Sequence, residues 1–153
     1  MIKYEVALKK KGRLKTMSDC IFCKIINGEI PSQKVYENDH VYAFLDISPV
    51  TKGHTLVIPK VHKENVFELS EEEAANLFKE VPKIANAVKK AFNPIGLNTI
   101  NNNGEHAGQS VFHFHMHIIP RYGKGDGFGA VWKTHEESSD ELKQIAGEIK
   151  NNI

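Results

Sequence analysis

The sequence predicts an α+β fold, in which an antiparallel sheet of about five strands packs on one long helix. Strand-like runs of β-branched and aromatic residues follow one another through connections short enough for hairpins. Only one long segment, residues 70–92, keeps the helical spacing of apolar residues. This grouping of strands about one helix favours an antiparallel sheet over a doubly wound parallel one.

The first part of the chain is expected to hold a short helix and three strands. Residues 19–28, DCIFCKIING, place four apolar side chains on one side of a short helix that ends at a glycine. Residues 34–38 and 40–47 read as two strands joined by a hairpin turn at an Asn-Asp pair. Residues 54–60, HTLVIPK, form a third strand that is almost entirely apolar.

The long helix has a well-defined start. Ser70 suits the N-cap position, and Glu73 supplies the acid of a capping box. The acidic first turn also opposes the positive end of the helix dipole. Pro82 lies inside the segment, so we expect it to kink the helix.

The second part of the chain adds two strands and a C-terminal helix. Residues 96–102 are expected to form a strand, residues 103–110 a polar loop, and residues 111–120 the last core strand. A final helix begins at one of the two serines 138 and 139 and ends at Asn151. Its apolar face contains Leu142, Ile145, Ala146 and Ile149.

Length and composition indicate one globular domain. The chain has 153 residues, of which 41% are hydrophobic and 25% are charged, as is ordinary for a domain with a real core. The net charge of +1 provides no overall field for nucleic acid or an anionic membrane. No apolar run is long enough to cross a bilayer. We therefore expect neither a nucleic-acid partner nor a membrane partner, and a cytoplasmic location.

Residues 1–16 form a basic N-terminal extension without helical or strand periodicity. They fit either a basic arm for an anionic partner or a disordered extension, and the second interpretation is favoured because untethered termini are seldom ordered. Met17 opens the segment MSDCIFCKI and suits an authentic start. We therefore expect a single domain over residues 17–153, with residues 1–16 disordered or upstream of the true start.

The only two cysteines, Cys20 and Cys23, form a Cys-x-x-Cys pair. One such pair excludes a disulfide framework. It leaves three interpretations, namely a redox pair, half of a metal site, or a coincidence of buried small residues.

Three histidines alternate with apolar residues in the segment VFHFHMHIIPR, residues 111–121. Because side chains alternate between the two faces of a strand, His113, His115 and His117 are expected to share one face. The apolar residues between them can pack under the long helix. A row of imidazoles suits metal binding or acid–base and nucleophilic chemistry, and the simplest alternative is a solvated polar face.

The segment GQSVFHFHMHIIPR resembles the signature of the histidine triad (HIT) family, in which three histidines alternate with apolar residues after Gly-Gln-Ser or Gly-Gln-Thr. Residues 21–60 resemble the N-terminal half of the family, and NNNGEHAGQS resembles its phosphate loop. The resemblance covers residues 20–132 and points to bacterial members of the nucleotide phosphoramidase branch related to protein kinase C-interacting protein. It implies a HIT-like fold whose sheet extends across a homodimer.

The resemblance implies a hydrolase that cleaves nucleotidyl conjugates, such as purine nucleoside phosphoramidates, at the α-phosphate through a covalent nucleotidyl-histidine intermediate. His115 corresponds to the nucleophile and His117 to the residue that contacts the phosphates and leaving group. A neutral imidazole is a competent nucleophile near neutral pH. Alternatives are a dinucleoside polyphosphate hydrolase and a nucleotide-binding regulatory module. Nucleotidyl transfer is disfavoured, because the uridylyltransferase relatives have Gln where this chain has His117.

The resemblance also implies a purine nucleotide site. Asp46 corresponds to the acid that accepts the ribose hydroxyls, although a turn cap is an equally good interpretation of this residue taken alone. Without the family, the apolar members of the site would be assigned to the core. Phe22, Ile25, Phe44 and Ile47 correspond to the purine pocket, and Asn102, Gln109 and Ser110 correspond to phosphate-contacting residues.

HIT relatives that carry Cys-x-x-Cys imply a structural zinc ion for this chain. The corresponding ligands are Cys20, Cys23, His62 and His113. Two thiolates and two imidazoles suit tetrahedral zinc. His54 is the rival for the fourth ligand position. The region of Trp132 corresponds to a C-terminal segment that reaches the partner subunit's active site in relatives.

Overall fold

The computed structural model describes residues 19–129 and 131–153, so the expectations for residues 1–16 and Met17 lie outside the described residues. The described residues form an α+β fold with five strands, as predicted. The helices are α1 Ile21–Ile26, α2 Glu71–Phe78, α3 Val81–Phe92 and α4 Ser139–Lys150, and the short 3-10 helices are η2 Val66–Glu68 and η3 Glu105–Ala107. The strands are β1 Lys34–Glu37, β2 Val41–Leu45, β3 Thr55–Pro59, β4 Gly96–Ile100 and β5 Met116–Arg121.

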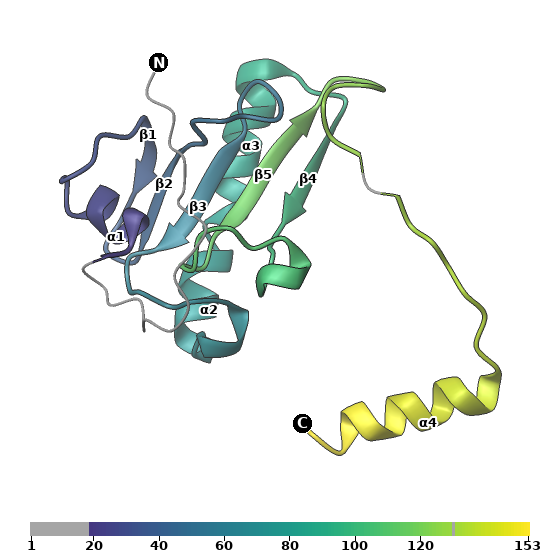
Figure 1. Ribbon diagram of the computed structural model, residues 1–153. Helices are drawn as coiled ribbons and strands as arrows, with labels where there is room; N and C mark the ends of the chain where they lie inside the picture. The colour runs from purple at the N-terminus through teal and green to yellow at the C-terminus, as the bar shows by residue number, and fades with distance from the viewer. Residues whose placement is uncertain (1–18, 130) are drawn as a thin grey trace.

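The strands form one antiparallel sheet in the order β1-β2-β3-β5-β4 (Figure 1). The predicted β1–β2 hairpin is confirmed. Its turn is held by Asn38, whose Oδ1 accepts hydrogen bonds from the backbone N–H groups of His40 (2.9 Å) and Val41 (2.8 Å). Strand β5 lies between β3 and β4, so His117 has Leu56 on one side and Ile100 on the other. The histidine segment therefore leads into the middle of the sheet.

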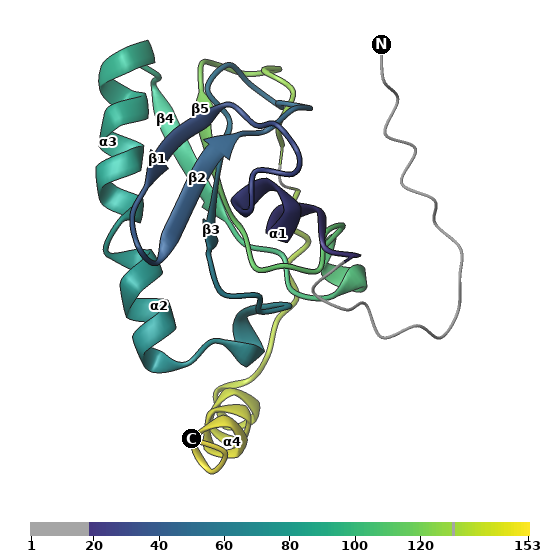
Figure 2. The same cartoon turned by 90° about the vertical axis from the view of Figure 1, so that its left-hand side faces the viewer.

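Helices cover both faces of the sheet. Figure 2 shows α2 and α3 on one face and the short α1 on the other. Alternation along β2 produces two separate cores, because Val41 and Ala43 join the cluster beneath α2 and α3, whereas Tyr42 and Phe44 join the cluster beneath α1. The site described below lies on the α1 side.

Pro82 divides the predicted long helix instead of kinking it. Helix α2 ends at Phe78 and α3 begins at Val81, so Pro82 becomes the second residue of a new helix. A proline is tolerated there because the first backbone N–H groups of a helix have no partner within it. The predicted capping box is confirmed, since the Ser70 hydroxyl accepts from the Glu73 N–H and the Glu73 carboxylate accepts from the Ser70 N–H.

The last core strand is shorter than predicted. Strand β5 begins at Met116, so His113 and His115 precede it. The β3–β5 ladder starts at the Val57–Met116 pair, and the segment before it is held instead by the Phe114 N–H donating to the carbonyl of Lys63 at 2.6 Å. The alternation nevertheless continues, because Phe114 is buried in the cluster beneath α2 and α3 while His113 and His115 are buried against α1.

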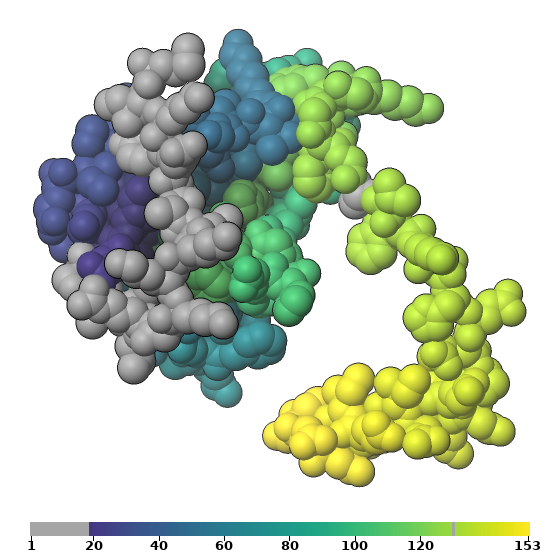
Figure 3. Space-filling view, in the orientation of Figure 1, coloured from purple at the N-terminus to yellow at the C-terminus, as the bar shows by residue number. Residues whose placement is uncertain are grey.

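The C-terminal helix α4 forms as predicted. Ser138 is its N-cap and makes a second capping box with Glu141. Figure 3 shows α4 at the end of an extended segment that stands away from the sheet and its helices. Among the described residues, no helix has the length and apolar character needed to span a membrane.

Candidate active site and metal centre

Three histidines and one acid meet beside the start of β5. The ring centroids of His115 and His117 are 4.9 Å apart, and those of His54 and His117 are 5.1 Å apart. The Nε2 atom of His54 lies 2.9 Å from Nδ1 of His117 and 3.6 Å from a carboxylate oxygen of Asp46. His54 comes from the loop before β3, so sheet pairing brings distant segments of the chain together.

The partners of each ring determine where its proton lies. Nδ1 of His115 is 2.7 Å from the carbonyl oxygen of His113 and must donate to it, which leaves the lone pair of Nε2 free. Nδ1 of His54 accepts from the Val50 N–H at 3.1 Å, so its proton is on Nε2 and is donated to Nδ1 of His117. The proton of His117 therefore lies on Nε2. The site thus presents one unprotonated nitrogen, on His115, and one N–H donor, on His117.

Burial keeps these rings neutral. It lowers the pKa of His115 below its ordinary value, against the opposing effects of the His113 carbonyl and of Asp46. Burial, followed by the neighbouring rings of His115 and His54, lowers the pKa of His117 to about 4. Burial also lowers the pKa of His54. Near neutral pH all three rings are uncharged, as a histidine nucleophile requires.

Helix α1 supplies an aromatic wall. The Phe22 ring meets His115 edge-on at 5.3 Å and His113 at 5.8 Å between centroids, and Phe44 stands behind it at 5.5 Å. Phe22, Ile25 and Phe44 are all buried in the cluster beneath α1. Ile47, the fourth predicted pocket residue, is 69% exposed and lies outside that cluster.

Asp46 forms the turn cap that one of its two predicted interpretations describes, and its other oxygen faces a histidine. Its Oδ1 accepts from the Ser48 N–H at 2.8 Å, which is the turn cap. Its Oδ2 is the oxygen near His54. One carboxylate oxygen thus holds the loop, and the other faces the histidine cluster.

The predicted phosphate residues differ in their surroundings. The Gln109 amide is buried and bonded to the backbone on every side: its Oε1 accepts from Gly104 N–H (2.7 Å), and its Nε2 donates to the carbonyls of Glu64 (2.6 Å) and Val111 (3.1 Å). It therefore organises the loop. Ser110 is exposed, and Asn102 is half-buried with its amide beside Gly108.

Two residues outside the predicted set hold the backbone at His115. Asn101 Nδ2 donates to the carbonyl of His115 at 2.9 Å, and Asn103 Nδ2 donates to Oδ1 of Asn101 at 2.6 Å. The Val66 N–H in turn donates to Asn103 at 2.8 Å. Three consecutive asparagines, 101–103, are visible in the sequence, but only the register of β4 on β5 decides which amide faces the His115 carbonyl.

A second cluster joins α1 to the segment before β5. Nδ1 of His113 lies 3.4 Å from Sγ of Cys20 and 3.6 Å from Sγ of Cys23, and Nδ1 of His62 lies 3.3 Å from Sγ of Cys23. These four ligand atoms all lie within 4.8 Å of one another. His54 belongs to the other cluster, so the geometry brings His62, and not its rival, to the cysteines.

The donor chemistry suits a tetrahedral zinc ion. Nε2 of His113 donates to the Pro59 carbonyl at 2.8 Å, which leaves Nδ1 unprotonated and facing the two sulfur atoms. Burial and the neighbouring Cys20 raise the pKa of the Cys23 thiol to about 12, so a cation is needed to stabilise two thiolates here. Two sulfur and two nitrogen ligands favour zinc over magnesium or calcium.

Comparison with known protein families identifies the family of this chain. The HIT domain profile covers residues 27–124. The chain is 66% identical over 137 residues to "Protein hit" of Bacillus subtilis (strain 168), an alignment that covers 88% of this chain and 94% of that protein. This chain belongs to the HIT domain family. A crystal structure of a HIT family member from Bacillus subtilis has a TM-score of 0.87 at 66% identity, covering 88% of this chain and 97% of that chain.

Two further HIT relatives carry informative descriptions. The adenosine 5'-monophosphoramidase hnt1 of Schizosaccharomyces pombe is 43% identical over 134 residues, which cover 88% of this chain and 98% of that protein. The structure of a zinc-bound histidine triad family protein from Mycobacterium smegmatis has a TM-score of 0.69 at 32% identity, covering 90% of this chain and all of that chain (100%). HIT relatives of this chain therefore include a nucleotide hydrolase and a zinc-bound protein.

Proposed function

We propose that this HIT protein hydrolyses nucleotidyl conjugates, above all purine nucleoside phosphoramidates, at the α-phosphate. The observation that carries the proposal is the hydrogen bond from Nδ1 of His115 to the carbonyl of His113, at 2.7 Å. It holds the ring with the lone pair of Nε2 free, as nucleophilic attack on phosphorus requires. The phosphoramidase activity of the hnt1 relative supports the substrate class.

The first step is attack of His115 Nε2 on the α-phosphorus. A bond forms between nitrogen and phosphorus, and the bond from phosphorus to the leaving amine breaks. The Nε2–H of His117 supplies the proton that the departing nitrogen needs, while the N–H of His54 continues to donate to Nδ1 of His117. The product of this step is a nucleotidyl-His115 and a free amine.

The second step is hydrolysis of that intermediate. Loss of the Nε2 proton leaves His117 as an imidazolate, to which the N–H of His54 donates, and its Nε2 can accept a proton from an attacking water molecule. As the bond from phosphorus to the water oxygen forms, the bond from phosphorus to Nε2 of His115 breaks, which releases the nucleoside monophosphate and restores the lone pair of His115. The Val50 N–H keeps the proton of His54 on Nε2, and this N–H donates to Nδ1 of His117 in both steps, so the proton of His117 leaves and returns at Nε2.

Nucleotide binding is assigned to the surrounding residues. Oδ2 of Asp46 would accept the ribose hydroxyls, and Phe22, Ile25, Phe44 and Ile47 would surround the purine. Ser110 and Asn102 would donate to the phosphate, and Gln109 would hold the loop that carries them. Apolar contacts to a base select weakly between bases, so the proposal extends to several purine nucleotides.

Zinc at the Cys20, Cys23, His62 and His113 cluster is proposed as a structural ion. When bound, it would cross-link α1 to the segment before β5 and thereby fix His113, whose carbonyl orients His115. No chemical step is assigned to it.

The decisive experiment compares adenosine phosphoramidate with a diadenosine polyphosphate, using the wild type and His115→Ala. We expect faster turnover of the phosphoramidate by the wild type and its loss in the variant. Preferred cleavage of the dinucleotide would support the alternative polyphosphate hydrolase. Binding of AMP without turnover of either substrate would support a regulatory module, and an active His115→Ala would exclude His115 as the nucleophile.

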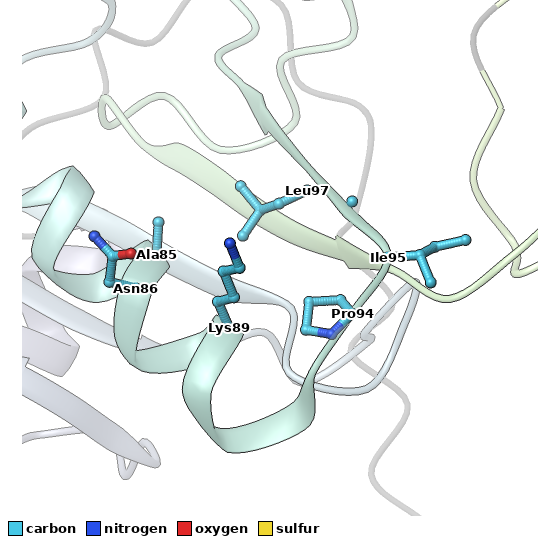
Figure 4. A pocket seen from close by; sticks show the side chains of 7 residues that line it. Ala85, Asn86, Lys89, Pro94, Ile95 and Leu97 are labelled. Atoms are coloured by element: carbon cyan, nitrogen blue, oxygen red, sulfur yellow. The ribbon is translucent and has the colours of Figure 1, made fainter.

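We also propose a homodimer joined at β4. Within the described residues β4 pairs only with β5, so its outer edge offers backbone groups to a second strand. A groove between α3 and this edge is lined mainly by apolar groups, among them Ala85, Pro94 and Leu97 (Figure 4). Ile95, which also lines this groove, is 80% exposed. Sedimentation velocity would reveal the association.

A further inference from the structure

The turn that precedes β3, residues 50–54, sets where the proton of His54 lies. The Val50 N–H donates to Nδ1 of His54 at 3.1 Å, and the backbone N–H of His54 donates to the carbonyl of Thr51 at 3.1 Å. Nδ1 is thereby kept as an acceptor, so Nε2 of His54 carries the ring proton and donates to Nδ1 of His117 at 2.9 Å. The tautomers of both rings therefore depend on the position of one backbone N–H group.

Thr51 anchors this turn to β5. The residue is 7% exposed, and its hydroxyl donates to the carbonyl of the buried Pro120 at 2.6 Å. The β3–β5 ladder extends only as far as the Thr55–Ile118 pair, so the hydroxyl joins the turn to β5 beyond the end of the ladder. His117 lies on the same strand, three residues before Pro120. The Thr51 hydroxyl and the ring of His54 thus connect the same turn to the same strand.

Two further contacts hold the turn from the outside. The Tyr122 hydroxyl donates to the Lys52 carbonyl at 2.7 Å, and Gly127 lies so close to the Val50 carbonyl that an added Cβ would be 2.9 Å from the oxygen. Tyr122 and Gly127 are both exposed, so water can replace the hydrogen bond to Lys52. The acceptor of the Thr51 hydroxyl is buried, and water cannot readily take the place of a lost donor there. Thr51 is therefore the contact on which the position of the turn depends.

We propose that Thr51 is a positioning residue for proton transfer, because its hydroxyl holds the Val50 N–H on Nδ1 of His54. The proposal rests on the proposed function, in which the Nε2–H of His117 protonates the departing amine. Without the hydroxyl, the ring proton of His54 moves to Nδ1, and Nε2 of His54 becomes an acceptor. The proton of His117 then moves to its own Nδ1 and is donated to His54, which leaves Nε2 of His117 unprotonated. Each ring keeps one proton, and the donor to the leaving group is lost.

Selectivity between leaving groups tests this role. Thr51→Val replaces the hydroxyl with a methyl group of similar size, and Thr51→Ser keeps a hydroxyl. With adenosine phosphoramidate, we expect Thr51→Val to lower kcat by about 10-fold or more while KM changes little, because the lost proton donor acts only in the transition state. An adenylate ester of an acidic phenol needs little protonation and should lose less than about 2-fold. Thr51→Ser should restore the wild-type rates. Equal losses for the two substrates, or wild-type rates in Thr51→Val, would overturn the proposal.

Histidine NMR tests the tautomers without any substrate. In full-length protein at neutral pH, the ring ¹⁵N shifts should place the proton of His54 and of His117 on Nε2 in the wild type and in Thr51→Ser. The same shifts should place both protons on Nδ1 in Thr51→Val. Thr51→Ala, which removes the hydroxyl without putting a methyl group in its place, should behave like Thr51→Val.

Thr55→Val is the matched control. Its hydroxyl donates to the Gly53 carbonyl of the same turn at 2.9 Å and makes no bond to β5, so its removal should leave both tautomers unchanged. Wild-type tautomers in both Thr51→Val and Thr51→Ala would overturn the proposal. Because the NMR readout uses no substrate, failure of this positioning role and failure of the proposed hydrolysis would be seen separately.

Discussion

Nδ1 of His115 lies 2.7 Å from the carbonyl oxygen of His113, so the backbone of one histidine fixes the tautomer of the next. The same His113 presents its Nδ1 to Cys20 and Cys23. One residue therefore belongs to the metal cluster through its side chain and to the active site through its backbone. The proposed zinc site and the orientation of the proposed nucleophile therefore share His113.

His117→Ala should affect substrates according to their leaving groups. If Nε2–H of His117 protonates a departing amine, its removal should slow phosphoramidate cleavage by about 10²–10⁴-fold. A nucleotidyl ester with an acidic phenol as leaving group needs little protonation and should lose much less. Rates for the two substrates, measured with the same variant, check this, and equal losses would argue against the proton-donor role.

Asn101→Ala should lower kcat while leaving KM nearly unchanged. The variant loses the donor to the His115 carbonyl, and a hydrogen bond is worth about 0.5–1.5 kcal/mol, so a loss of up to about 10-fold is expected. Asn102→Ala is the matched control. Because Asn102 is assigned to phosphate binding, its variant should raise KM instead. The opposite pattern would reverse the two assignments.

Removal of one zinc ligand should lower both metal content and stability. Elemental analysis of the wild type should show one zinc ion per chain, and Cys20→Ser and His62→Ala should each contain far less. Their thermal midpoints should fall, because structural zinc contributes directly to folding. His54→Ala should keep its zinc, since His54 lies in the other cluster. Zinc loss in His54→Ala but not in His62→Ala would restore His54 as the fourth ligand.

Stability should decrease on acidification through His117. Burial lowers the pKa of this ring in the folded protein from 6.5 to about 4. Between these two pH values the unfolded chain binds the proton more readily, so the folded state is favoured fully above pH 6.5 and progressively less as the pH falls towards 4. Urea unfolding at several pH values checks this. His117→Asn should flatten the dependence over that range, and an unchanged slope would contradict the assignment.

Local sequence features predicted most of the secondary structure. Ser70 with Glu73 and Ser138 with Glu141 mark two helix starts, because a capping box needs only residues three positions apart. Pro82 predicted an interruption of the helix over residues 70–92. Whether that helix kinks or divides depends on how α2 and α3 pack on the sheet. The last strand was predicted too long, because His113 and His115 precede Met116, where pairing with β3 begins.

The sequence by itself determined which histidines share a side. His113, His115 and His117 share one side of the segment although the first two precede the regular strand, because an extended backbone alternates its side chains locally. The resemblance of the surrounding segment to the HIT family then provided an expected role for each of these histidines.

Only the tertiary structure decided which partners these histidines meet. His62 and not His54 reaches the cysteines, Asn101 faces the His115 carbonyl, and the Gln109 amide turns to the backbone. Each of these contacts joins segments whose approach depends on strand order, register and loop path. A sequence read residue by residue does not contain those distances, because they follow from how the whole sheet assembles.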